Sequence, residues 1–136
     1  MQSRTKKRAG WIAAIVVLGA LIAVGIAYLL YGDQWKARHD VRALRTGLDF
    51  YLAEQGAYPQ GSPGELAGLL LGQSVRGQNP TRKSYIVARP DEMNEDGAFI
   101  DPWGTPYRIL IDAVPRVYSC GPNGQDENGG GDDISP

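Results

Sequence analysis

The stretch SCGPNGQDENGGGDD, Ser119 to Asp133, gathers oxygen donors and glycines near the end of the chain. It offers carboxylates, side-chain amides and backbone carbonyls, which are the hard ligands that calcium prefers, usually six to eight at about 2.3–2.6 Å. Composition alone favours a disordered acidic tail, because the glycines at 129–131 have no side chain to pack. The residues themselves therefore leave two alternatives open, a cation-binding loop and a polar tail.

Other reactive side chains are few and scattered. The chain has one cysteine, Cys120, and one histidine, His39. A single cysteine allows neither an internal disulfide nor a thiolate zinc cage, and His39 stands among charged residues, where a solvated position is expected. No nucleophile–base pair, phosphate-binding glycine loop or pair of catalytic carboxylates can be assembled. The sequence therefore predicts a protein that is not an enzyme.

Length and charge narrow the class further. The 136 residues carry a formal net charge of -1, with basic residues crowded at positions 4–8 and acids crowded at 126–133. A chain of this length can build one small soluble domain beside any membrane segment. The basic residues at 4–8 are not interleaved with aromatic residues, so nucleic-acid binding is not expected.

An apolar segment near the start predicts a membrane anchor. Residues 11–31, WIAAIVVLGALIAVGIAYLLY, contain no charge. About 21 helical residues span roughly 30 Å, the hydrocarbon thickness of a bilayer. Trp11, Tyr28 and Tyr31 fall near the two ends, where aromatic rings prefer the headgroup level. A cleaved signal peptide is the alternative, but its apolar region is usually about 7–15 residues. We expect a retained transmembrane helix after a basic segment at 1–10.

The orientation of the predicted transmembrane helix in the membrane cannot be decided by counting basic residues alone. Four basic residues stand on each side of the span, at 4–8 and at 36–45, so the count is a tie. The first group is tighter and contains no acid, and a long C-terminal domain translocates largely regardless of its charge. We therefore expect residues 1–10 in the cytoplasm and residues 32–136 outside it.

The helix is expected to continue beyond the membrane. Apolar residues recur at three- and four-residue steps: Val41, Leu44, Leu48, Tyr51 and Leu52. This period is typical of an amphipathic helix, and no proline separates it from the span. The simplest prediction is one helix from about Trp11 to Gln55, ended by Gly56 in the left-handed conformation and by Pro59.

A second helix and a small sheet complete the predicted α+β fold. Ser62 and Glu65 form a capping box around Pro63, which opens a helix over about 63–71; its leucines at 66, 69 and 70 should pack on the long helix. Strands are expected at 107–111 and 117–119, and weakly at 84–88, forming an antiparallel sheet. In DPWGTPY, Asp101 to Tyr107, the order Asp, Pro and Gly predicts a specified turn, with Trp103 capping the core.

Three motifs in this order resemble one bacterial family. YLAEQGAYPQG ends the long helix, DPWGTPYRI forms the turn, and YSCGPNG followed by DDIS closes the chain. Together they resemble the major pseudopilins of type II secretion systems and their relatives. The resemblance implies a pilin-like fold and a structural subunit of a pseudopilus or related assembly. It also implies an inner-membrane, single-pass protein with residues 32–136 in the periplasm. Its partners would be membrane lipid, other pseudopilin subunits, further copies of itself and inner-membrane components of the secretion machine.

The resemblance also implies calcium as a cofactor. The positions that match the family's calcium loop are the Cys120 carbonyl, the Asn123 side chain and the carboxylates of Asp132 and Asp133, with Asp126 and Ser135 as additional candidates. Asn123 stands where the family usually has aspartate. With the resemblance added, a calcium loop is favoured over the polar tail.

The N-terminus departs from the family pattern. Family members carry a glycine, a phenylalanine-like residue and a glutamate at the fifth mature position, which guide cleavage, methylation and subunit packing. The best match to this processing site is Gly10 followed by Trp11, with Ile15 at the fifth position, and the span contains no acid. A second hypothesis therefore stands beside the first, a singly anchored pilin-like binding or scaffold module that does not polymerise.

Overall fold

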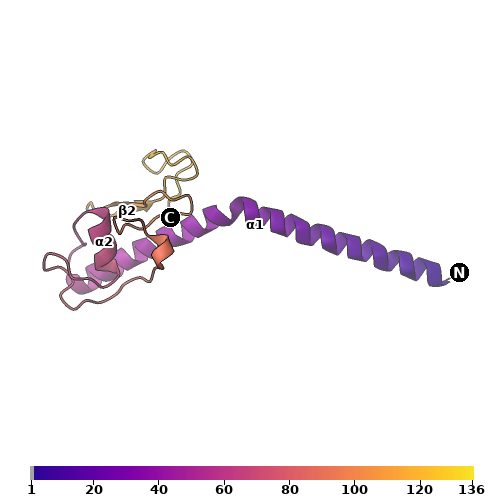
Figure 1. Cartoon of the computed structure of the whole chain (residues 1–136), viewed down its shortest axis with the longest axis horizontal. Helices are drawn as coiled ribbons and strands as arrows, with labels where there is room; N and C mark the ends of the chain where they lie inside the picture. The colour runs from indigo at the N-terminus through magenta and orange to yellow at the C-terminus, as the bar shows by residue number, and fades with distance from the viewer. Residues whose placement is uncertain (1) are drawn as a thin grey trace. The chain divides into compact units, whose positions relative to one another are not determined.

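The computed structural model describes the backbone of residues 2–136 and the side chains of residues 11–29 and 31–136. It divides into two compact units, Met1–Asp33 and Gln34–Pro136. The elements in chain order are α1 (Gln2–Gln55), α2 (Pro63–Leu70), the 3-10 helix η1 (Pro90–Glu92), β1 (Arg108–Leu110) and β2 (Arg116–Tyr118), as labelled in Figure 1. The α+β class predicted from the sequence is confirmed.

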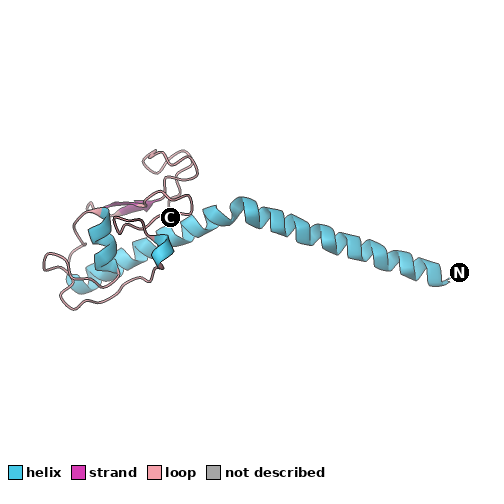
Figure 2. Ribbon diagram, in the orientation of Figure 1, coloured by secondary structure: helices cyan, strands magenta, loops and turns pink. Residues whose placement is uncertain are grey.

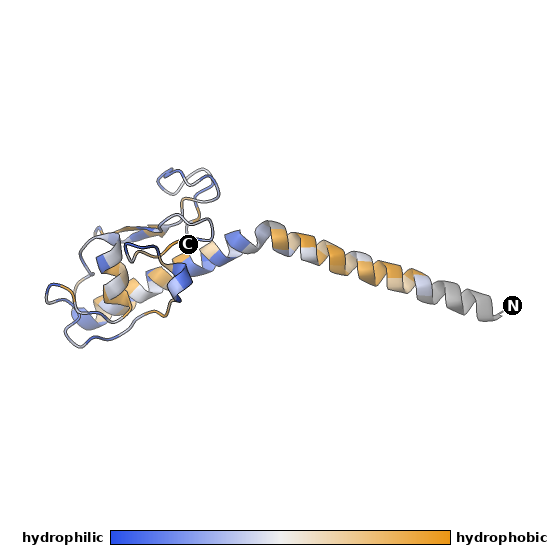
Figure 3. Cartoon of the chain, in the orientation of Figure 1, coloured by the Kyte–Doolittle hydropathy of each residue, from blue (hydrophilic) through white to orange (hydrophobic). Residues whose placement is uncertain are grey.

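The first unit is helical throughout its described residues. Within α1, Trp11–Leu29 is long and apolar enough to cross a membrane, judged by length and composition, and none of it is buried within the protein. Figure 3 shows this stretch as a nearly continuous orange run. The side chains of the predicted cytoplasmic segment 1–10, and the surroundings of the predicted processing residue Gly10, lie outside the described residues.

The second unit is built on the C-terminal part of α1. Val41, Leu44, Leu48 and Tyr51 are buried on one face of the helix, as predicted, whereas Leu52 is only half-buried. Gly56 stops the helix: its φ is 79°, and its N–H donates to the Leu52 carbonyl at 2.9 Å. Glycine adopts this left-handed conformation without the steric cost that a side chain would add.

The second helix follows the predicted capping box. The Ser62 N–H donates to Glu65 Oε2 at 2.7 Å, and the Glu65 N–H donates to Ser62 Oγ at 3.4 Å. Leu66, Leu69 and Leu70 are buried, and Leu69 and Leu70 belong to the same apolar core as Leu48. The prediction that α2 packs onto α1 is confirmed for Leu69 and Leu70, whereas Leu66 is buried but does not belong to this cluster.

The sheet is smaller than predicted. β1 and β2 pair antiparallel, with Arg108 opposite Tyr118 and Leu110 opposite Arg116. The expected strand at 84–88 is wrong: the N–H groups of Tyr85 and Ile86 both turn to the Leu70 carbonyl, at 2.8 and 3.3 Å, and thereby satisfy the end of α2. Figure 2 shows that loops make up most of the chain beyond α2.

The DPWG turn is organised by one carboxylate. Asp101 is 3% exposed, and its Oδ1 accepts the N–H groups of Trp103 at 3.1 Å and Thr105 at 2.9 Å. Its Oδ2 accepts the Ser119 hydroxyl at 2.6 Å, which attaches the turn to the residue that follows β2. The predicted turn is confirmed, although Trp103 is only half-buried and lies outside the central apolar core.

Candidate cation-binding loop

The glycine-rich segment is closed into a loop at its base. The Ser119 N–H donates to the Ile134 carbonyl at 3.0 Å, and the Ile134 N–H donates back to the Ser119 carbonyl at 2.9 Å. Ile134 is 6% exposed, so its side chain fixes this end of the chain against the protein. Residues 120–133 therefore fold back onto the end of β2 instead of trailing away from it.

Gly121 allows the two sides of the loop to meet. Its φ is 66°, and a Cβ at this position would lie 2.2 Å from the Asp132 carbonyl oxygen. Any side chain would clash with backbone there, so glycine is required for the close approach as well as for the left-handed conformation. The consequence is that Cys120 and Gly121 lie beside Asp132.

Three carboxylates converge in the loop. One oxygen from each of Glu127, Asp132 and Asp133 lies within 4.8 Å of the other two. Backbone N–H groups hold them in place: Asp132 Oδ2 accepts Asn123 N–H at 3.0 Å, and Asp133 Oδ2 accepts Gly129 N–H at 2.8 Å. Glu127 Oε2 accepts Asp132 N–H at 3.0 Å. Each carboxylate is thus oriented by the loop's own backbone.

The second oxygens of the two aspartates are left without partners. Asp132 Oδ1 and Asp133 Oδ1 are both buried and accept no hydrogen bond within the described chain. No lysine or arginine whose side chain is described pairs with Glu127, Asp132 or Asp133. Burying a charged acceptor without a partner is costly, and clustered acids repel one another. A calcium ion, which takes carboxylate and carbonyl oxygens, would satisfy both requirements, so the residues fit this group.

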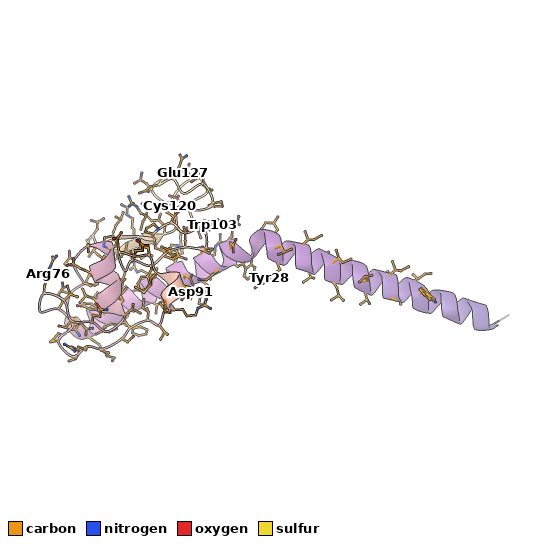
Figure 4. All side chains as sticks on the ribbon, in the orientation of Figure 1. Tyr28, Arg76, Asp91, Trp103, Cys120 and Glu127 are labelled. Carbon is orange, nitrogen blue, oxygen red and sulfur yellow. The ribbon has the colours of Figure 1, made fainter. Side chains whose placement is uncertain are left out.

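The other two predicted ligands lie next to this cluster. Asn123 contacts Asp132 through its backbone N–H, while its side-chain oxygen accepts Gln125 N–H at 2.6 Å. Cys120 is buried at the base of the loop (Figure 4). Burial, and then the nearby carboxylates of Asp126 and Asp133, raise the pKa of the Cys120 thiol. A neutral thiol is a poor ligand for calcium, so Cys120 would contribute its carbonyl.

The structure places two acidic residues differently from the ligand set that the sequence implies. Glu127, which the resemblance leaves outside the ligand set, is brought into the cluster by its bond to the Asp132 N–H. Asp126, named as an additional candidate, instead accepts the Arg108 guanidinium at 2.7 Å and the Tyr118 hydroxyl at 2.8 Å. The hydrogen bond from Tyr118, then that from Asn128 N–H, lowers the pKa of Asp126. Asp126 is thus engaged by β1 and β2 and is not one of the three converging carboxylates.

Comparison with known proteins places this fold and loop in one family. The family of type II secretion system protein G matches residues 27–135. This chain belongs to that family. Its member in Aeromonas hydrophila, type II secretion system core protein G, is 32% identical over 132 residues, covering 88% of this chain and 82% of the relative. The core protein G of Pseudomonas aeruginosa is 30% identical over 127 residues, covering 88% and 81%.

A solved structure agrees with the family assignment. The major pseudopilin from the type 2 secretion system of enterohaemorrhagic Escherichia coli superposes with a TM-score of 0.54 at 26% identity, covering 80% of this chain and 90% of that one. The pilin-like fold and the family predicted from the three motifs are therefore confirmed. The family match begins at residue 27, so the atypical residues Gly10, Trp11 and Ile15 of this family member lie outside it.

Proposed function

We propose that this protein is a non-catalytic structural subunit of a type II secretion pseudopilus, held in the inner membrane by residues 11–31. Family membership supports this function, since the relatives are named as secretion-system core proteins and the solved one as a major pseudopilin. The partners proposed are other pseudopilin subunits, including copies of this chain, and inner-membrane components of the secretion machine.

Calcium is proposed as the structural cofactor of the subunit. Glu127, Asp132 and Asp133 would supply carboxylate oxygens, and Cys120 and Asn123 would supply neutral ones. The observation that carries this is the pair of buried, unpartnered Oδ1 atoms on Asp132 and Asp133. The ion would supply positive charge, which offsets repulsion among the acids, while the loop's N–H groups orient them. Its task is to fasten the end of the chain to β2.

The periplasmic placement of residues 32–136 rests on the basic cluster at the start of the chain and the long domain behind the span. A C-terminal alkaline phosphatase fusion should be active. An inactive fusion, together with an active cytoplasmic reporter at the same site, would reverse the orientation.

A singly anchored module that does not polymerise is the second candidate. It is favoured by one observation, the absence of any acid among residues 11–31, where the family pattern has a glutamate. A mass spectrum of the protein isolated from membranes distinguishes the two. A chain that starts at methylated Trp11 in the spectrum, and that forms self-cross-links in a parallel cross-linking experiment, supports the pseudopilus subunit. A chain that retains Met1 and yields no self-cross-links supports the anchored module.

A further inference from the structure

An exposed basic face lies on α1 at the start of the second unit. Trp35, Arg38, His39 and Arg42 line a groove together with Gln34. Steps of three and four residues place these side chains on one face of the helix. All four are exposed, Trp35 by 79%, whereas Ala37, Val41 and Leu44 on the other face are buried. The core of the second unit therefore leaves this basic face free.

The chemistry of the basic face suits an anionic phosphate. Arginine presents a planar fork of donors that matches phosphate oxygens, and tryptophan prefers the headgroup level of a bilayer. The acid beside this face, Asp40, has its Oδ1 3.4 Å from His39 Nδ1, and its Oδ2 is engaged by Lys36 Nζ at 2.6 Å and by the Tyr107 hydroxyl at 3.1 Å. No described acid pairs with Arg38 or Arg42. Their positive charge is available to a ligand.

The position of the face along the helix suits the same ligand. The apolar stretch ends at Leu29, and the basic face begins shortly after it in the sequence, at Trp35. Figure 3 shows the change from orange to blue along this part of α1.

We propose that Trp35, Arg38, His39 and Arg42 bind the headgroups of anionic phospholipids in the bilayer that the adjoining helix crosses. This inference rests on the membrane anchoring proposed above. Both an anionic lipid and the acidic C-terminal loop of a second copy would complement the charge of this face; its closeness in sequence to the apolar segment favours lipid. Lipid binding here would fix the depth of the helix and its rotation about its own axis.

The test measures which lipids gather around Trp35 in the full-length protein. Trp11→Phe and Trp103→Phe leave Trp35 as the single tryptophan of three. The protein is reconstituted into phosphatidylcholine vesicles that contain phosphatidylglycerol, and energy transfer from Trp35 to pyrene-labelled forms of either lipid is compared. Phosphatidylglycerol should be enriched around Trp35 on the order of five-fold at low salt, since each arginine near the surface attracts anionic lipid. Enrichment should fall steeply in about 0.5 M salt.

Two double variants decide whether the basic face is responsible. Arg38→Gln with Arg42→Gln should reduce the enrichment to about one-fold, whereas Arg82→Gln with Arg116→Gln, at two exposed positions elsewhere, should leave it unchanged. Equal transfer to both lipids in the parent protein, or enrichment that survives the first double variant, would overturn the proposal. So would transfer that depends on protein density and not on headgroup, which would indicate a second copy on this face. Protein that fails to float with the vesicles would refute the anchoring itself.

Discussion

Two regions of the second unit bury carboxylate oxygens. They differ in whether those oxygens have hydrogen-bond partners. In the DPWG turn, both oxygens of Asp101 are satisfied by three donors: Trp103 N–H, Thr105 N–H and Ser119 Oγ–H. In the C-terminal loop, Asp132 and Asp133 each have one oxygen held by backbone N–H groups and one oxygen buried without a partner. The turn is complete without a ligand, whereas the loop has the acceptors of a site that a cation would complete.

The largest effect is expected from removing the satisfied carboxylate. Asp101→Ala would leave three donors without an acceptor, each costing about 1–3 kcal/mol, so the free energy of unfolding should fall by about 3 kcal/mol or more. The loss should be the same in calcium and in chelator, because Asp101 lies outside the proposed site. Urea denaturation of residues 34–136 measures it. Asp112→Ala, at an exposed position, is the control; equal costs for the two variants would remove Asp101 from its anchoring role.

The unpartnered oxygens of Asp132 and Asp133 predict that the stability of the second unit depends on calcium. An ion that binds only the folded form stabilises it by about 2.7 kcal/mol at 100 times its dissociation constant. Thermal unfolding of residues 34–136 in millimolar calcium should therefore occur at a clearly higher temperature than in chelator. Asp132→Ala and Asp133→Ala should each abolish most of the difference.

Asp126→Ala is the matched control for that experiment. Asp126 has the same charge and lies in the same loop, but its carboxylate is held by Arg108 and Tyr118. It should keep the calcium-dependent increment even if the chelated protein becomes less stable. Superimposable melting curves in calcium and chelator for the parent chain would show that the loop is only a polar segment.

Glu92 is another carboxylate with hydrogen-bond partners, and it predicts that the free energy of unfolding decreases in acid. Hydrogen bonds from Arg89 N–H at 2.9 Å and then from Lys36 Nζ lower the pKa of Glu92 from 4.5 to about 2. Because the folded pKa lies below the unfolded one, the stability that Glu92 contributes is present above about pH 4.5 and is lost as the pH falls towards 2. In chelator, Glu92→Gln should reduce the pH dependence of unfolding in this window by about 1–2 kcal/mol. An unchanged pH profile would mean that Glu92 is not held in this way.

Local chemistry explains which of these regions could be predicted from the sequence. The capping box of Ser62 and Glu65 and the turn around Asp101 join residues within four positions of each other, so their residue types specify the geometry. The strand expected at 84–88 was wrong because its N–H groups bind the Leu70 carbonyl, a partner fixed only by tertiary packing. Glu127 was missed for a related reason, since only the folded loop brings it to Asp132.

Glu127 gives the smallest effect and the sharpest test of the loop's composition. The family resemblance places it outside the ligand set, whereas the structure places its carboxylate within 4.8 Å of ligand atoms on Asp132 and Asp133. Glu127→Gln keeps an oxygen that can accept the Asp132 N–H but removes one negative charge, and calcium affinity depends on the number of charged ligands. We expect calcium affinity to fall about five-fold, which corresponds to about 1 kcal/mol, with little change in chelator. Isothermal titration of residues 34–136 with calcium measures the affinity, and Glu95→Gln, at an exposed position far from the loop in sequence, is the control. If Glu127→Gln and Glu95→Gln bind calcium equally well, the ligand set is the one that the motif alone implies, and the proximity of Glu127 serves only to orient the Asp132 backbone.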